Sequence, residues 1–294
     1  MSNSSPNNSI PAQERIKGVF STQEIRKVGT GTTQRKTVYK GFHFIEQDES
    51  GRIECQPLNS NYIPSGQKRN ISIEELMEKF SPEPEFYLSA VYPKMQELQR
   101  TLDNGDSHRE KGESFAAEYE YAAALTVDEE NVRANFGIGL TYLQRGENNR
   151  ADDIFERLVK LEAAFAPEHK HMFNEFGINL RKARMYDQAV EYYRRALELT
   201  AEDENLHINI ARAFFELKDL ESCIRHLGLA LTMAPTHEQA TRFLIWLLEK
   251  NMLTPAMAAS AKQTLLAVRQ ALKQEAEQAD QQTAATTEHS VNGS

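Results

Sequence analysis

Apolar residues in the middle of the chain recur at the spacing of an amphipathic helix. Between residues 186 and 199, Val190, Tyr193 and Leu197 follow one another at intervals of three and four residues, and charged residues such as Glu191 lie between them. A period close to 3.6 residues places the apolar side chains on one face and the charged side chains on the opposite face. The pattern predicts a helix that packs against other elements through its apolar face.

Two adjacent segments carry the same pattern, and each predicts a pair of helices. Residues 170–203 and 204–237 superimpose without a gap at a spacing of 34 residues. The matches include small side chains at equivalent places, which are Gly177 with Ala211, Ala189 with Cys223, and Ala196 with Ala230. Small side chains let two helix backbones approach closely, so we expect these residues at helix crossings. Pro235 fits the break after the second copy, because a proline inside a helix would clash with the preceding turn.

The 34-residue period and the small residues in register resemble the tetratricopeptide (TPR) repeat family. The resemblance implies a mainly α-helical chain, in which helical hairpins stack into a superhelix of about three and a half repeats. The units that we expect are a degenerate repeat at 98–131, repeats at 132–169, 170–203 and 204–237, and capping helices at 238–278. The first complete repeat carries extra residues near AFAPEH, which should lengthen its second helix or the loop that follows.

A strand-like pattern precedes the repeats. The segments KTVYKGFHFIEQ at 36–47 and RIECQPL at 52–58 predict two β-strands, and DESG at 48–51 predicts the turn between them. Because two strands are marginally stable alone, we expect this β-hairpin to pack on helices or on a partner, within a small α+β domain at 14–95. Ser72 begins a capping-box pattern that opens a helix of this domain.

Composition and charge indicate a soluble protein of a reducing compartment. Hydrophobic residues make up 40% of the chain, and the net charge is -9. No apolar run approaches the roughly 20 residues that cross a bilayer, and the first residues form no secretory signal, so we expect a cytoplasmic protein. Cys55 and Cys223 lie far apart in the sequence and are expected to be unpaired. The polar ends at 1–13 and 279–294 are expected to be disordered.

The sequence contains no convincing catalytic constellation, so we expect neither an enzyme nor a cofactor. VGTGTT at 28–33 lacks the lysine and the helix of a phosphate-binding P-loop, and a flexible turn explains it better. His169 and His171 diverge on a helix, and no further ligand stands at metal-site spacing. The carboxylate clamp of some TPR proteins is also missing, because Phe136 and Leu140 occupy the places of its first lysine and asparagine.

The family resemblance also implies a binding surface. In TPR proteins, positions 2, 5, 9 and 12 of each repeat face a concave groove that receives a peptide. In this chain those places hold Arg133, Phe136, Leu140, Leu143, His171, Asn174, Ile178, Arg181, Asn205, Ile208, Arg212, Phe215, Arg242 and Trp246. None of them is acidic, which favours a groove that binds an acidic segment with apolar side chains. The alternative is that Phe136, Phe215 and Trp246 are core residues or cap contacts.

We infer from the sequence a non-enzymatic adaptor that presents a concave surface to a partner protein or peptide. One alternative is a specialised chaperone, similar to the TPR chaperones of bacterial secretion systems. The other is binding of nucleic acid or an anionic ligand through residues 14–40, which hold seven basic and two acidic residues.

Overall fold

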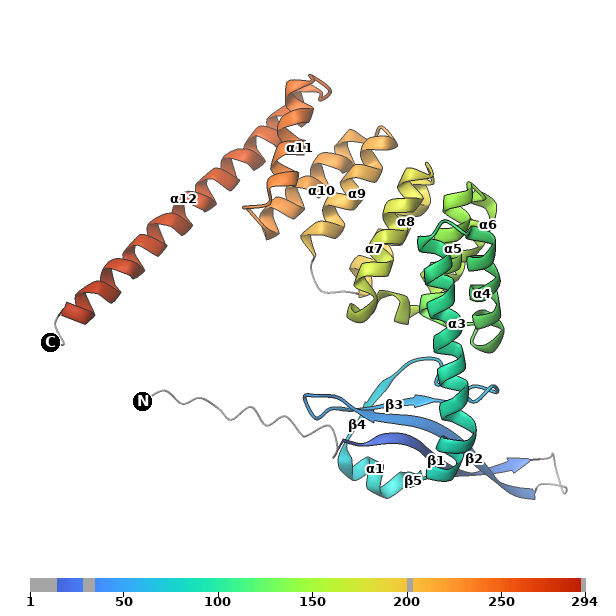
Figure 1. The fold of residues 1–294 in the computed structure, drawn as a ribbon. Helices are drawn as coiled ribbons and strands as arrows, with labels where there is room; N and C mark the ends of the chain where they lie inside the picture. The colour runs from blue at the N-terminus through green and yellow to red at the C-terminus, as the bar shows by residue number, and fades with distance from the viewer. Residues whose placement is uncertain (1–14, 29–34, 200–202, 292–294) are drawn as a thin grey trace. The chain divides into compact units, whose positions relative to one another are not determined.

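The computed structural model describes residues 15–28, 35–199 and 203–291. The chain folds into two compact units, of which the first extends to Ala164 and the second begins at Phe165 (Figure 1). The division falls inside the segment 132–169, which the sequence analysis assigned to a single repeat. The expected disorder of residues 1–13 and most of the VGTGTT segment lie outside the described residues.

A five-stranded antiparallel sheet opens the first unit, in the order β4–β3–β2–β1–β5. Its strands are β1 (Lys17–Val28), β2 (Arg35–Gln47), β3 (Ile53–Pro57), β4 (Arg69–Ile71) and β5 (Ser81–Pro82). The predicted hairpin is confirmed as β2–β3, with Ile45 opposite Cys55. The sequence analysis missed β1, which pairs with β2 along its whole length. Few apolar residues alternate in β1, so its position in the sheet depends on this pairing.

Side chains of β2 alternate between two faces of the sheet, and each face has its own core. On one face, Ile45 packs with residues that include Leu76 of α1 (Ile73–Lys79). On the other face, Phe44 packs with Val91, which ends the π-helical turn η2 (Tyr87–Val91) after the short helix α2 (Pro84–Phe86). The predicted cap of α1 is confirmed, because Ser72 Oγ accepts a hydrogen bond from the Glu75 backbone N–H at 3.1 Å.

Four longer helices complete the first unit, and consecutive ones pack against each other. They are α3 (Tyr92–Glu110), α4 (Ser114–Val127), α5 (Val132–Arg145) and α6 (Asn148–Lys160). The degenerate repeat is therefore a helical hairpin, α3–α4, although α3 begins before residue 98. Gly105 lies in α3, within the expected degenerate repeat. It has a packing role, because a Cβ there would lie only 2.8 Å from Cε1 of Tyr121.

The second unit contains six α-helices among its described residues. They are α7 (Lys170–Lys182), α8 (Tyr186–Leu199), α9 (Glu204–Glu216), α10 (Leu220–Met233), α11 (Glu238–Glu249) and α12 (Pro255–Val291). The predicted close crossings are confirmed, because Ala189, Ala211 and Cys223 are fully buried. A Cβ on Gly177 would lie 2.4 Å from Cζ of Tyr193.

Two short 3₁₀ turns, η3 (Glu162–Phe165) and η4 (Pro167–His169), follow α6 and contain the extra residues, so the insertion lengthens the loop. Helix α12 continues to Val291, whereas disorder was expected from residue 279. None of the helices in the described part of the chain is both long enough and apolar enough to span a bilayer.

Candidate protein-binding site

Side chains from three helices of the second unit surround one hollow. Helix α7 contributes Arg181, α9 contributes Arg212 and Phe215, and α11 contributes Phe243 and Trp246. With Glu216 they line a space of about 330 Å³. The spacing within each helix explains the convergence, because residues three positions apart, as in both pairs, share a helix face. Four of the six lining residues are groove positions expected from the sequence.

Phe215, Phe243 and Trp246 form an aromatic cluster at the hollow. The ring centroid of Phe215 lies 5.6 Å from each of the other two centroids, with interplanar angles of 76° and 71°. Such edge-to-face pairs stabilise one another beyond the apolar area that they bury. Trp246 nevertheless remains 38% exposed. The cluster is thus an ordered apolar surface that is open to a ligand.

Arg212 lies at the hollow and forms no ion pair with a carboxylate of the described residues, although Glu216 lines the same hollow one turn away on α9. Its Nη2 donates to Oε1 of Gln239 at 2.9 Å and its Nη1 to Oδ1 of Asn209 at 3.5 Å, and both acceptors are neutral amides. Burial and the nearby positive charge of Arg181 lower the pKa of Arg212. Because a guanidinium stays charged in proteins, both effects are unfavourable in the free protein, and an incoming anion would relieve them.

Arg181 adds a second positive charge at the hollow, and Tyr193 lies buried close to both arginines. Nη1 of Arg181 lies 3.9 Å from Oε1 of Glu216, at the outer limit of an ion pair, and the two arginines together leave an excess of positive charge over that carboxylate. The hydroxyl of Tyr193 is buried against Gly177 and has no hydrogen-bond partner among the described residues. Burial raises the pKa of Tyr193, and the positive charges of Arg181 and Arg212 oppose that rise.

Several expected groove residues belong to the core, as the alternative interpretation held for Phe136. Phe136, Leu140 and Leu143 are buried in the first unit, where α3 and α4 contact α5. Ile208 is buried in the second unit. The expectation that these four side chains face a groove was therefore wrong.

The remaining expected residues are accessible but lie outside the hollow. Arg133 donates from Nη2 to Asp103 at 2.8 Å and to Asp106 at 2.5 Å, so two carboxylates of α3 compensate its charge. Arg242 pairs with Glu238 one turn away on its own helix. The others, which do not line the hollow either, are His171, Asn174, Ile178 and Asn205.

Sequence reasoning missed Phe243 and Glu216 as lining residues. They stand at positions 6 and 13 of their repeats, one place after the positions that the family pattern assigns to the groove. The spacing of Phe243 and Trp246 repeats that of Arg212 and Phe215, and this shared spacing was the available signal.

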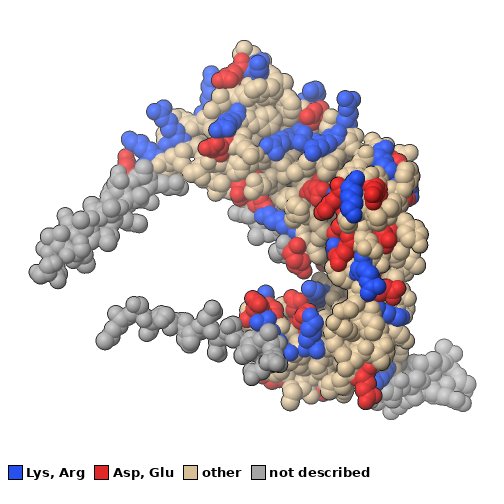
Figure 2. All heavy atoms as spheres, in the orientation of Figure 1, with Lys and Arg blue, Asp and Glu red and all other residues tan. Residues whose placement is uncertain are grey.

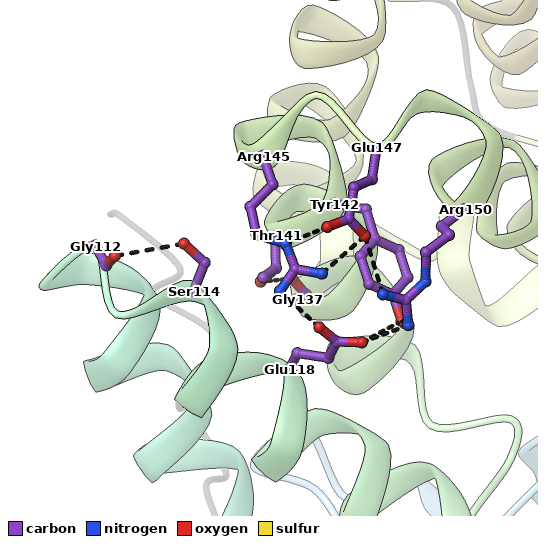
Figure 3. Close-up of polar contacts among 9 residues, drawn as sticks. All are labelled: Gly112, Ser114, Glu118, Gly137, Thr141, Tyr142, Arg145, Glu147 and Arg150. Carbon is purple, nitrogen blue, oxygen red and sulfur yellow. Dashed lines mark hydrogen bonds and ion pairs between the residues drawn. The ribbon is translucent and has the colours of Figure 1, made fainter.

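A second polar cluster, at α4, α5 and α6 of the first unit, has the character of a structural link (Figure 3). Glu118 of α4 pairs with Arg145 at 2.6 Å and also with Arg150, and Glu147 pairs with the same two arginines. Burial opposes the ionisation of Glu118, but hydrogen bonds from Arg150 and Arg145 prevail and lower its pKa. Tyr142 accepts a hydrogen bond from Arg150 at 2.6 Å.

Charges in this cluster compensate one another, which leaves no cation for a ligand. Figure 2 shows the same mixture more widely, with acidic and basic side chains interspersed over α5 and α6 on the face in view. The cluster ties α4 to the following hairpin and leaves the hollow of the second unit as the candidate binding site.

Comparisons with known proteins agree with the helical hairpins. Residues 132–165 and 172–203 match the family model described as tetratricopeptide repeat. This chain contains tetratricopeptide repeats. Tetratricopeptide repeats are protein-binding modules, so the two matched repeats support an interaction scaffold.

Two relatives of this TPR protein are subunits of the anaphase-promoting complex of Schizosaccharomyces pombe. Subunit 3 is 24% identical over 148 residues, which are 50% of this chain and 22% of that protein. Subunit cut9 is 35% identical over 78 residues, which are 26% of this chain and 12% of that protein. The chain thus spans less than a quarter of the length of either relative.

Among solved structures, similarity extends to MamA and YrrB. A crystal structure of MamA is 18% identical with a TM-score of 0.43, over 61% of this chain and 94% of MamA. YrrB, described as a TPR protein with an unusual peptide-binding site, is 20% identical with a TM-score of 0.38, over 59% of this chain and 90% of YrrB.

Proposed function

We propose that this TPR protein binds an acidic segment of a partner protein in the hollow between α7, α9 and α11. The observation that carries the proposal is Arg212, a half-buried cation whose hydrogen-bond acceptors are neutral amides and which the positive charge of Arg181 repels. A carboxylate of the partner would pair with Arg212 and Arg181, and two charge-assisted hydrogen bonds of this kind are each worth about 1.5–3 kcal/mol.

An apolar side chain next to that carboxylate supplies the second part of the recognition. Phe215, Phe243 and Trp246 present an open aromatic surface beside the arginines. Burying a leucine or phenylalanine side chain of the partner there is worth about 1.5–3 kcal/mol. Because the three helices are already packed, the receptor surface needs little ordering on binding, which preserves the affinity.

Charge reversal at the hollow tests the proposal. A phage-displayed library of random 12-residue peptides is selected on the full chain, and the selected peptide is then titrated by fluorescence anisotropy. We expect acidic peptides with an aromatic or aliphatic residue. The double variant Arg181→Glu/Arg212→Glu should weaken binding at least about 100-fold, because two favourable pairs become repulsive.

The matched control reverses two cations that lie outside the hollow, on α7 and α11, which are two of the three helices that form it. Lys182→Glu/Arg242→Glu changes the net charge by the same amount, and both side chains are exposed. Binding to this control should stay within about twofold of the wild type. Equal weakening of the two double variants would show a general charge effect, and unchanged binding of Arg181→Glu/Arg212→Glu would place the peptide elsewhere.

A further inference from the structure

Strands β1 and β2 form a long two-stranded ribbon that extends beyond the end of the other strands of the sheet (Figure 1). β2 is a strand of 13 residues, but β3 pairs only with its stretch from His43 to Gln47. The last bond on that edge runs from the Leu58 N–H to the Phe42 carbonyl at 2.9 Å. Among the described residues, no strand continues along β2 from Gly41 back to Arg35.

Strand register shows which backbone groups this edge presents. The Phe42 carbonyl points toward β3, and alternate residues of a strand point their backbone groups to the same edge. Lys40 and Val38 therefore present N–H and C=O groups outward, while residues between them bond to β1. The same register places the Gln47 N–H on the opposite edge, where it donates to Ile16 at 2.8 Å. An unpaired row of this kind is a template for another strand.

A hollow of about 470 Å³ lies beside this edge, where β3 ends. Its lining includes Tyr39, Phe42 and Tyr62, and the first and last of these rings are 53% and 40% exposed. Two cations border the rings, because Lys40 Nζ lies 5.3 Å from the Phe42 centroid and Lys94 Nζ lies 4.8 Å from the Tyr62 centroid. The hollow therefore offers aromatic and apolar contact beside two lysines, of which Lys40 is paired with Glu83.

We propose that β2 accepts an extended acidic segment of a partner protein as an additional strand, with an apolar side chain in this hollow. The charge of the ribbon identifies the occupant: residues 24–40 hold five basic residues and one acidic residue. Glu83 compensates Lys40 at 2.5 Å, and the other charged residues of this stretch, four basic and one acidic, keep its net charge at +3. An open row of backbone groups recognises another polypeptide backbone, which favours a peptide over a nucleic acid.

Two substitutions at one position separate backbone pairing from charge. Lys40→Ala and Lys40→Pro remove the same side chain and the same pair with Glu83. Only proline also removes the outward N–H, and an edge strand tolerates proline where the N–H faces solvent. Both variants are made in the Arg181→Glu/Arg212→Glu background, so that the hollow of the second unit does not contribute.

The probes are a phage-displayed library of random 12-residue peptides and a 20-nucleotide single-stranded DNA. We expect the library to yield acidic peptides with alternating β-branched residues, and Lys40→Pro to bind them about tenfold more weakly than Lys40→Ala. Equal binding by the two variants overturns strand addition. Binding of the DNA with no peptide selected overturns the choice of partner.

Amide hydrogen exchange followed by NMR provides a measurement that does not depend on how proline is tolerated. The selected peptide is added to the protein that keeps Lys40. The amide protons of Val38 and Lys40 should then exchange at least about tenfold more slowly than without the peptide. Those of Thr37, Tyr39 and Gly41 already bond to β1 and should change little. Protection without this alternation would overturn the proposal.

Discussion

Helix crossings at small residues predict that Gly177→Ala destabilises the second unit. The ideal Cβ at this position would lie 2.4 Å from Cζ, 2.5 Å from Oη and 2.8 Å from Cε1 of Tyr193. These distances are shorter than any van der Waals contact, and the ring is itself 1% exposed, so it has little freedom to move. Either the ring or the α7–α8 crossing has to shift.

Packing and helix propensity oppose each other in this substitution. Overpacking a core typically costs about 1–3 kcal/mol, and the clash with three ring atoms places this variant at the upper end of that range. Replacing glycine by alanine inside a helix returns about 1 kcal/mol. The net loss should be about 2 kcal/mol, which lowers the melting temperature of a unit of this size by roughly 6 °C.

Gly228→Ala is the matched control, because Gly228 also lies inside a helix. Its ideal Cβ would meet Thr264 only at 3.7 Å, an ordinary contact, so the helix-propensity gain should prevail and stability should rise by up to about 1 kcal/mol. Urea denaturation followed by circular dichroism measures both variants. In a Tyr193→Ala background the loss from Gly177→Ala should disappear. Equal stability changes at the two glycines would refute the close crossing.

Two further predictions concern titration and the polar cluster. His226 is buried beside His207, with Nδ1 atoms 3.0 Å apart, and burial followed by the charge of His207 lowers the pKa of His226 to about 4 from an ordinary value of 6.5. Because the unfolded chain then binds a proton more readily than the folded one, the free energy of unfolding should fall by roughly 3 kcal/mol as the pH drops from 6.5 to 4. His226→Phe should make the free energy of unfolding less dependent on pH in this range. The same pH dependence in this variant would contradict the low pKa of His226. Glu118→Gln removes the carboxylate that joins Arg145 and Arg150, and should reduce the free energy of unfolding by roughly 1–2 kcal/mol, since Glu118 is partly exposed. Glu156→Gln, an exposed substitution on α6, should leave the urea midpoint unchanged, and a similar loss in both variants would argue against the link.

Local patterns allowed much of the fold to be predicted. The 34-residue repeat located the hairpins, because small residues at a fixed period mark helix crossings wherever they occur, as Ala189 and Cys223 do. The β2–β3 hairpin and the Ser72 cap were also predictable, since a turn and an N-cap depend on residues within a few positions of each other. Arg181, Arg212, Phe215 and Trp246, which line the hollow, are among the groove positions that register alone predicts.

Only the tertiary structure decided which of the groove positions share one site. Phe136 and Leu140 occupy the same repeat positions as Asn174 and Ile178, yet they are buried, because the neighbouring helices cover them. Register specifies the face of a helix on which a side chain lies, whereas exposure depends on what packs against that face. The open edge of β2 could not be predicted from the sequence for the same reason. It begins where β3 ends, so it depends on the length of β3 and not on the residues of β2.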